Sequence, residues 1–367
     1  MPAKLFSIPF LTALIMLQHS GVAQMRNVAD GPYVFYHGGK VDVITIRPKD
    51  STAAAAIESY AERDKLTQTI PVTLSGLPDK GFTFRLHPIS NEASTWETND
   101  KILAVSDIEG EFAGFRTLLI GNKVIDEDYN WTFGAGHLVI CGDLFDRGRD
   151  VIPLMWLLYK LENDATAHGG HVHVILGNHE IMNLSGDFRY VTRKYFLSAH
   201  AMGIPYNQVF DIHSELGRWL RSKNIVEQIG GILFLHAGVS PQINGMGMSI
   251  KAINQQSRPY FAFPLENVPA NMQDYFNENS PFWYRGYFDS LQHVKVGMSE
   301  VDSTLRLFKV NQIIVGHSLT DQVSRLYNGK VYSIDVNTHA GLENGLLIEN
   351  GKFYRVDANG TKTELKD

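Results

Sequence analysis

The chain of 367 residues contains a single cysteine, Cys141, and this scarcity excludes two kinds of architecture. One thiol allows no disulfide bond within the chain, and it is too few for a cysteine-rich zinc or iron–sulfur site. An excess of basic residues is also missing, because 33 lysines and arginines face 39 acidic residues, which gives a formal net charge of −6. No overall positive field attracts nucleic acid or an anionic membrane, so we expect neither as a partner.

Apolar runs long enough to span a bilayer are absent as well. The run from Leu5 to Leu17 is too short to cross a membrane as a helix, but it follows Lys4 and precedes the small residues Gly21 and Ala23. This pattern is typical of a secretory signal peptide. We therefore expect residues 1–23 to be a cleaved signal peptide, and the mature protein to be periplasmic or secreted without stable membrane insertion. A buried N-terminal helix is the alternative.

Residues 24–100 have the pattern of a small β-rich N-terminal extension. Strand-like runs at Tyr33–Tyr36 and Val41–Ile46 flank Gly38-Gly39, which predicts a hairpin. No catalytic set of side chains stands out in this region. The other elements that we expect are a short helix near Ala53–Leu66, strands at Ile70–Leu74 and Phe82–Leu86, and a polar linker at Asn91–Asp100.

Residues 101–350 show a different pattern, in which short apolar runs end at polar residues next to glycine. Such runs favour strands buried on both faces. Asp107 and Asp143 are 36 residues apart, and Asp143 and Asn178 are 35 apart, which is the spacing of βαβ units. We predict an α/β domain here, followed by a C-terminal tail at 351–367. Its expected elements are strands at Ile102–Val105, Leu138–Cys141, Val172–Leu176, Ile232–Leu235 and Ile313–Val315, and a helix at Val151–Leu161.

Each of these five strands is followed by a residue whose side chain is of a type that can bind metals. These residues are Asp107, Asp143, Asn178, His236 and His317. Functional groups gather at the carboxyl ends of strands in open α/β sheets. Carboxylate and amide oxygens together with imidazoles suit divalent ions such as Mn, Fe, Zn or Mg. Two such ions, about 3.5–4 Å apart, lower the pKa of a shared water and hold the oxygens of a phosphoryl group. The pattern therefore predicts two-metal hydrolysis of a phosphoester.

The motifs that carry these residues resemble those of calcineurin-like metallophosphoesterases, specifically the phosphoprotein-phosphatase branch and its exported bacterial relatives. The resemblance covers Lys101 to Glu349 and implies a layered β-sandwich flanked by helices. The matching motifs, in the family's order, are Ser106-Asp107-Ile108-Glu109-Gly110, Gly142-Asp143-Leu144-Phe145-Asp146-Arg147-Gly148, Gly177-Asn178-His179-Glu180, His236-Ala237-Gly238 and Gly316-His317-Ser318.

The resemblance implies a role for each matching residue. Asp107 would bind the first metal, Asp143 would bridge both, and the second metal would be bound by Asn178, His236 and His317.

His179 would be the general acid that protonates the leaving oxygen, oriented by Asp146. This pairing is physically sound, because a carboxylate keeps an imidazolium protonated near neutral pH. Arg147 would bind the phosphate oxygens through its planar guanidinium. Arg285 is the candidate for a second phosphate-binding arginine.

The first motif departs from the family, which usually has Asp-x-His where this chain has Asp107-Ile108-Glu109. We expect Glu109 to replace the imidazole as a ligand, which makes the site harder and favours Mn or Mg over Zn. The alternative is that Glu109 is a solvated loop acid and the first metal binds weakly. Glu111 is expected to be a surface group or a group that supports the ligands, and His339 is expected to be structural.

The sequence thus predicts a dinuclear-metal phosphomonoesterase that acts by direct attack of metal-bound hydroxide. The expected substrates are phosphoproteins carrying phosphorylated Ser, Thr or Tyr, or small aryl phosphates. Two alternatives are a nucleotide-polyphosphate hydrolase of the diadenosine tetraphosphatase kind and a non-catalytic binding module. The aromatic-rich stretch from Tyr260 to Phe288 is either a lid that grips an aromatic leaving group or, as we favour, an insertion packed on the core.

Overall fold

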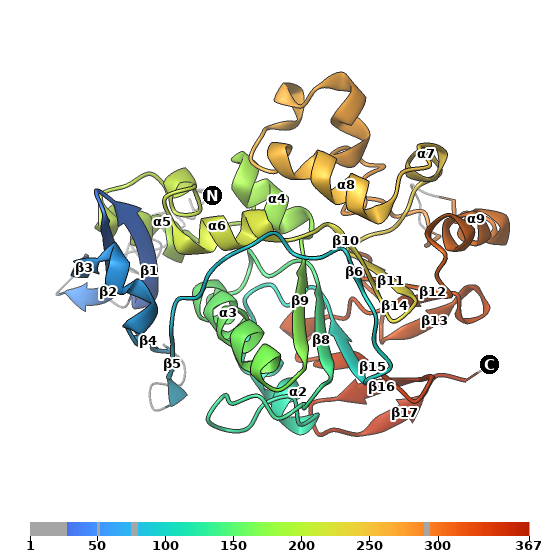
Figure 1. Ribbon diagram of the computed structural model, residues 1–367, viewed down its shortest axis with the longest axis horizontal. Helices are drawn as coiled ribbons and strands as arrows, with labels where there is room; N and C mark the ends of the chain where they lie inside the picture. Colours follow the sequence, from blue (N-terminus) through green and yellow to red (C-terminus); the bar gives the residue numbers. More distant parts are fainter. Residues whose placement is uncertain (1–27, 50–51, 75–79, 290–293, 367) are drawn as a thin grey trace, which may run out of the picture.

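The computed structural model describes residues 28–49, 52–74, 80–289 and 294–366, so the expected signal peptide lies outside the described residues. Two six-stranded sheets pack face to face and are flanked by helices, as Figure 1 shows. The first sheet has the order β17 (Lys362–Glu364), β16 (Lys352–Asp357), β15 (Asn344–Glu349), β7 (Ile102–Val105), β8 (His137–Cys141) and β9 (His171–Ile175). The predicted layered α/β fold is confirmed.

The second sheet contains the other predicted strands and part of the expected linker. Its edge strand β6 (Thr95–Trp96) comes from the segment that we expected to connect the extension to the catalytic domain, and it runs parallel to β10 (Val226–Ile229). The N-terminal region is therefore continuous with the sandwich. The order is β13 (Ser324–Leu326), β14 (Val331–Ser333), β12 (Gln312–Val315), β11 (Ile232–Leu235), β10 (Val226–Ile229) and β6.

The apolar runs form strands that bury both faces. Successive side chains on a strand point to opposite sides, so Ala104 packs between the two sheets while Leu103 faces the helices. On that outer face lie α2 (Phe112–Gly121) and α3 (Val151–Ala167), and α3 is longer than the predicted Val151–Leu161.

The N-terminal extension begins with a three-stranded antiparallel sheet. The predicted hairpin is present as β1 (Asp30–His37) and β2 (Lys40–Lys49), joined by two glycines whose positive φ angles fit its tight turn. The helix expected near Ala53–Leu66 is wrong. Residues Thr52–Ala61 form strand β3, which pairs with β2 from end to end, and only Glu62–Thr67 form a 3₁₀ helix, η1. Ten backbone pairings outweigh the helix propensity of four alanines.

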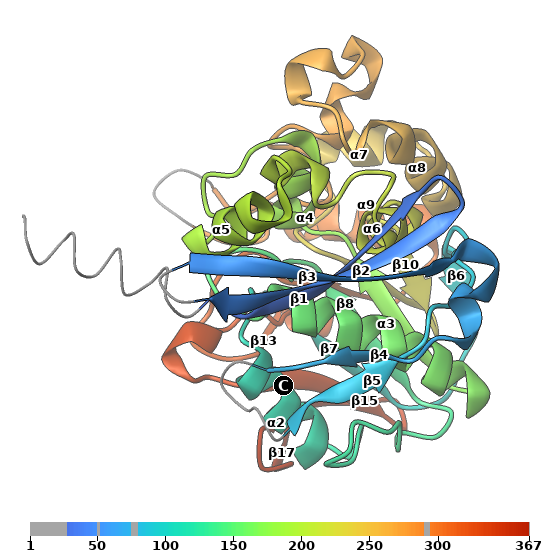
Figure 2. The same cartoon turned by 90° about the vertical axis from the view of Figure 1, so that its left-hand side faces the viewer.

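This extension packs on the catalytic domain through α3. Its second hairpin, β4 (Ile70–Val72) and β5 (Phe82–Phe84), places Phe84 on the indole of Trp156 with ring centroids 4.1 Å apart. The indole N–H of Trp156 donates to the carbonyl of Pro32 at 2.7 Å. Figure 2 shows the β1–β3 sheet lying across this side of the molecule. The extension therefore buries the outer face of α3.

The segment 351–367, expected as a C-terminal tail, adds β16 and β17 to the first sheet, where β16 pairs with β15 along six residues and buries Val356.

Among the described residues, no helix combines the length and the apolar character needed to cross a membrane. The remaining helices are α4 (Asn178–Ser185), α5 (Arg193–Met202), α6 (Glu215–Ser222), α7 (Pro241–Gly245), α8 (Ile250–Ser257), α9 (Met298–Phe308), η3 (Tyr206–Gln208), η4 (Arg258–Tyr260), η5 (Leu265–Asn267), η6 (Ala270–Tyr275), η7 (Tyr327–Gly329) and η8 (Thr338–Ala340).

Candidate metal centre and active site

A cavity of about 370 Å³ lies where the carboxyl ends of strands from both sheets meet. The first sheet contributes the residues after β7, β8 and β9, and the second contributes those after β12 and β14. Asp146 and His236 lie just behind its wall and contact residues that line it. The eight other sequence-predicted site residues line the cavity, and they are Asp107, Glu109, Asp143, Arg147, Asn178, His179, Arg285 and His317.

The residues expected to bind the second metal converge around Asp143. His236 Nε2 lies 3.2 Å from Asp143 Oδ2 and 2.9 Å from Asn178 Oδ1. Asp143, His236 and His317 each offer a ligand atom within 4.8 Å of the others, and all three are buried. His236 Nδ1 contacts the carbonyl of Cys141 at 2.7 Å, which leaves Nε2 to face the cavity.

A second group of ligand atoms overlaps with the first at Asp143. It contains Glu109, Asp143 and His179, again within 4.8 Å of one another. Asp143 thus belongs to both groups, and Glu109 is the other member of the second group that the sequence predicts as a ligand. Asp107 lines the same cavity but is not in either group. Its Oδ2 accepts hydrogen bonds from the hydroxyl of Ser106 at 2.5 Å and from the backbone N–H of His317 at 3.0 Å.

The backbone around these residues is strained. Twelve described residues other than glycine have positive φ, and six of them are predicted site residues, namely Asp107, Glu109, Asp143, Asp146, Arg147 and His317. Such conformations persist only where the surrounding structure enforces them, and they cluster at functional sites. The strand ends also approach one another closely. A Cβ at Gly177 would lie 2.2 Å from Asp143 Oδ1, and one at Gly316 would lie 2.4 Å from Asp107 Oδ2, so both positions require glycine.

Several carboxylates share this buried space. Burial, opposed by the charge of His236 and assisted by that of Asp143, raises the pKa of Asp107 to about 6. Burial and the charge of Asp107 raise the pKa of Asp335 to about 9. Burial disfavours a charge on His236, but Asp143 and Asp107 outweigh it and raise the pKa of His236 to about 10. The site is therefore electrostatically suited to additional positive charge.

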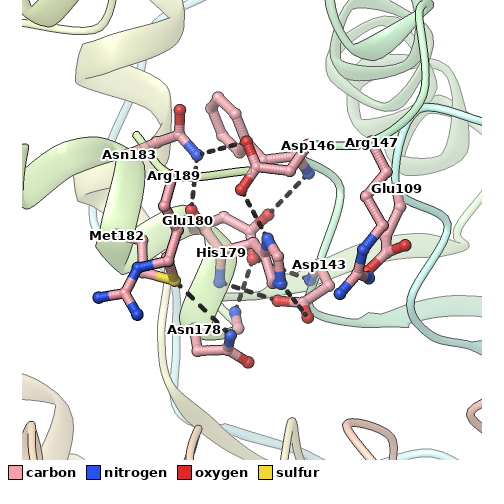
Figure 3. A network of polar contacts seen from close by, with 12 residues as sticks. Glu109, Asp143, Asp146, Arg147, Asn178, His179, Glu180, Met182, Asn183 and Arg189 are labelled. Carbon is pink, nitrogen blue, oxygen red and sulfur yellow. Dashed lines mark hydrogen bonds and ion pairs between the residues drawn. The ribbon is translucent and has the colours of Figure 1, made fainter. Parts of the chain in front are cut away.

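His179 is paired with Asp146 as the sequence predicts. Its Nδ1 lies 2.6 Å from Asp146 Oδ2, and Asn183 donates to the other carboxylate oxygen at 3.1 Å. Tyr206 donates to Asn183 Oδ1 at 2.8 Å and so holds Asn183 in place against Asp146. Figure 3 shows Asn183, Asp146 and His179 in contact. Burial lowers the pKa of His179, but the charges of Asp143 and Asp146 outweigh it, and the net shift is upward.

Glu180 is a structural centre that the sequence reasoning did not single out. It is fully buried, and its carboxylate accepts hydrogen bonds from the backbone N–H groups of Asp143, Leu144 and Gly177 at 2.9, 2.7 and 2.7 Å. It holds together the two loops that carry the predicted ligands. Its place in Gly177-Asn178-His179-Glu180 was the available signal.

The two predicted phosphate-binding arginines reach the cavity from opposite loops. Arg147 pairs with Glu109 and lies over the ring of Tyr190, 5.4 Å from its centroid. Arg285 donates to the backbone carbonyl of His317 at 2.8 Å. The side chain of Arg147 is 48% exposed, so it is accessible to an incoming phosphate.

The structure also brings residues into the cavity that the sequence reasoning set aside or missed. Asp335 follows the end of β14, and this position at a strand end was the only signal for it. Tyr190 had no signal. His339, expected to be structural, contacts Glu109 and Glu111. Trp283 lines the cavity with its ring 5.6 Å from that of His317.

Most of the aromatic stretch from Tyr260 to Phe288 packs as the favoured insertion. Phe261, Phe282 and Tyr287 are each at most 1% exposed and belong to the main hydrophobic core. Among the aromatic residues of this stretch, Trp283 borders the cavity, so the lid interpretation is reduced to one aromatic side chain.

Comparison with known proteins places this arrangement in a family. Residues 100–321 match the calcineurin-like phosphoesterases. The chain belongs to the calcineurin-like phosphoesterase family. Its structure superimposes on that of a cold-active protein-tyrosine phosphatase from a psychrophilic Shewanella species with a TM-score of 0.82 and 32% sequence identity, covering 92% of this chain and 99% of that one.

Curated relatives point in the same direction. Shewanella-like protein phosphatase 2 of Arabidopsis thaliana is 26% identical over 297 residues, which cover 68% of this chain and 74% of that protein. An uncharacterized Schizosaccharomyces pombe protein is 31% identical over 225 residues, and the match spans 59% of this chain and 66%, just under two thirds, of that relative. As a calcineurin-like phosphoesterase with protein phosphatases among its relatives, the protein is a metal-dependent phosphatase.

The phosphoesterase fold implies a pair of divalent metal ions, and the residues present fit that requirement. Buried carboxylates, one carboxamide and imidazoles face one cavity, and Asp143 is shared by two groups of candidate ligands. These donors suit hard and borderline divalent cations.

Proposed function

We propose that this phosphatase hydrolyses phosphate monoesters of phosphoproteins and accepts aryl esters such as phosphotyrosine. The observation that carries the proposal is the 2.6 Å pairing of His179 with Asp146 inside a cavity bordered by Arg147 and Arg285. A merely structural metal site needs neither an oriented acid nor two guanidinium groups.

Each side chain has a separate task in this mechanism. Two divalent cations would lower the pKa of a water and neutralise the phosphoryl oxygens. Their proposed ligands are Asp107, Glu109, Asp143, Asn178, His236 and His317. Arg147 and Arg285 orient the phosphoryl group through bidentate hydrogen bonds. Arg147 engages the substrate by exchanging its contact with Glu109 for one with phosphate.

His179 completes the reaction by donating a proton to the departing oxygen. Asp146 contacts Nδ1, so Nε2 carries the proton that is transferred. Nε2 lies 3.8 Å from Asp143 Oδ2, on the cavity side of the ring. A proton delivered there stabilises an alkoxide leaving group most, because an alkoxide is a stronger base than a phenoxide.

The preference for an aryl ester is supported by the rim of the cavity and by similarity to a protein-tyrosine phosphatase. Tyr190 and Trp283 line the cavity and offer aromatic faces to a phenyl ring. The test compares kcat/KM for phosphotyrosine and phosphoserine peptides in wild type, Tyr190→Ala and Trp283→Ala. We expect KM for the phosphotyrosine peptide to rise in both variants, while Phe196→Ala, an exposed aromatic outside the cavity, leaves it unchanged.

Faster hydrolysis of diadenosine tetraphosphate than of either peptide would contradict the proposal and favour the nucleotide-polyphosphate alternative. An unchanged KM in both rim variants would contradict the aryl preference alone.

Manganese is the proposed metal, since Glu109 in place of the usual histidine makes the donor set richer in oxygen. Metal analysis of protein isolated from its native compartment tests this identity.

We also retain the proposal that residues 1–23 direct export to the periplasm or medium. N-terminal sequencing of the protein from fractionated cells tests it, and a chain that still begins at Met1 would contradict it.

A further inference from the structure

His339 reaches the cavity from a segment outside all the matched motifs. It lies on η8, and the neighbouring Thr338 donates its hydroxyl to the carbonyl of Asp107 at 3.2 Å, which fastens this segment to the first motif. The ring is held between two carboxylates. Its Nε2 is 2.5 Å from Glu109 Oε2, and its Nδ1 is 2.9 Å from Glu111 Oε1.

The two ring nitrogens have different surroundings. Glu109 is buried at 4% exposure, so Nε2 faces the interior, whereas Glu111 is exposed and contacts the outward nitrogen. A histidine that binds a metal through one nitrogen almost always donates the other N–H to a carboxylate or carbonyl, which fixes the ring orientation. The contact between Glu111 and Nδ1 has this form, and Nε2 faces Glu109 in a cavity that Asp107 and Asp143 also line.

We propose that His339, oriented by Glu111, supplies the first metal with the imidazole ligand that the first motif of this chain lacks. The inference rests on the proposed dinuclear site. The first motif ends in Glu109 where the family usually has histidine, and the structure places the imidazole of His339 directly beside that carboxylate. A ligand from the far end of the sequence thus takes the place of one lost from the motif.

Both carboxylate oxygens of Glu109 have a partner in the structure. Oε2 faces His339, while Oε1 pairs with Arg147. Glu109 therefore lies between His339 and Arg147, and release of Arg147 to a phosphate leaves its contact with His339 in place. Glu111 is a positioning residue, because it acts on the metal only through the imidazole.

The test measures metal binding directly on the full chain. Equilibrium dialysis against Mn²⁺ is performed on wild type, His339→Ala, Glu111→Gln and the control His200→Ala, which removes an exposed histidine on α5. We expect about two ions per chain in wild type and the control. His339→Ala is expected to retain one tightly bound ion, and Glu111→Gln is expected to bind the first ion about 10–100-fold more weakly.

A spectroscopic readout separates ligation from general damage to the site. In the Co²⁺-loaded protein, the imidazole contribution to X-ray absorption is expected to fall in His339→Ala and to remain in the control. Because the His339 side chain is one-third exposed, the variant is expected to fold, and His339→Gln provides a second variant that retains a polar side chain.

The outcomes distinguish this inference from the proposed function. Two ions of unchanged affinity in both His339 variants, with an unchanged imidazole signal, would overturn the role of His339 and leave the dinuclear site intact. A wild-type protein that binds no Mn²⁺ or Co²⁺ would instead overturn the site itself.

Discussion

The carboxylate of Glu180 accepts a hydrogen bond from the backbone N–H of Asp143 at 2.9 Å, although 37 residues separate them in the sequence. It also accepts one from the N–H of Gly177 at 2.7 Å. The loop after β8 and the loop after β9 are therefore joined at one buried side chain. The positions of Asp143 and Asn178 depend on this junction.

Replacement of Glu180 by glutamine is expected to destabilise the protein and loosen the metal site. The amide nitrogen of glutamine would face backbone donors, which leaves buried N–H groups unsatisfied and costs about 1.5–3 kcal/mol. Urea denaturation with and without Mn²⁺ measures this loss. The control is Glu266→Gln on an exposed part of η5, and equal stability of the two variants would contradict the role of Glu180.

Removal of the general acid is expected to slow turnover without removing the metals. His179→Ala should lower kcat for a phosphoserine peptide by around 10²–10⁴, the usual range for general acid catalysis, and should lower it less for p-nitrophenyl phosphate, whose leaving group needs no proton. Stopped-flow or steady-state assays with metal analysis check both points. An equal loss on both substrates would argue against proton donation by His179.

The pH dependence of kcat is expected to report the same residue. Because Asp143 and Asp146 outweigh burial and raise the pKa of His179 above its ordinary value of 6.5, the acid form persists to higher pH than in a free imidazole and is lost as the pH rises through the raised pKa. Activity on alkyl esters should therefore decline on the alkaline side. Asp146→Asn should move that decline to lower pH, whereas a profile that does not move would contradict the pairing.

A buried histidine cluster at the opposite ends of the strands is expected to make the protein sensitive to acid. His137 Nδ1 contacts His173 Nε2 at 2.8 Å, and burial together with the charges of His173 and His171 lowers the pKa of His137 to about 4. The unfolded chain binds this proton near pH 6.5, so stability is complete above pH 6.5 and falls as the pH drops toward 4. A shift of this size corresponds to roughly 3 kcal/mol.

Thermal unfolding between pH 7 and 4 measures this effect. His137→Gln should flatten the decline, while the control His168→Gln, at an exposed position after α3, should retain it. Parallel curves for the two variants would show that other groups cause the acid sensitivity.

The N-terminal extension and the catalytic domain are expected to unfold together. Phe84 is buried against Trp156 of α3, so Phe84→Ala should cost about 3–5 kcal/mol of unfolding free energy. Calorimetry should show one transition that moves to lower temperature. Two separate transitions would indicate that the extension is an independent unit.

Much of the site was predictable from the sequence, because each motif residue follows an apolar run and strand ends meet at one edge. The lengths of those runs are enough to specify buried strands such as Ile232–Leu235, which has the predicted bounds. The residues around Ala53 were mispredicted because strand β3 derives its conformation from pairing with β2, and a local propensity carries no information about a distant partner.

The residues missed in the site have a different explanation. His339 and Asp335 lie on segments that reach the cavity only through the packing of the second sheet, and neither belongs to a matched motif. Tyr190 belongs to a connection between helices, where the sequence has no periodic pattern to place it. Their roles depend on tertiary distances, which motif spacing does not encode.

Asp143 belongs to one layer of the sandwich and His236 to the other, with 3.2 Å between their ligand atoms. A cation coordinated by both residues would therefore link the two sheets directly. Removal of the metal would therefore take away one link between the two sheets in addition to the chemistry that the metal supplies. We infer that metal binding stabilises the folded enzyme as well as supporting its turnover.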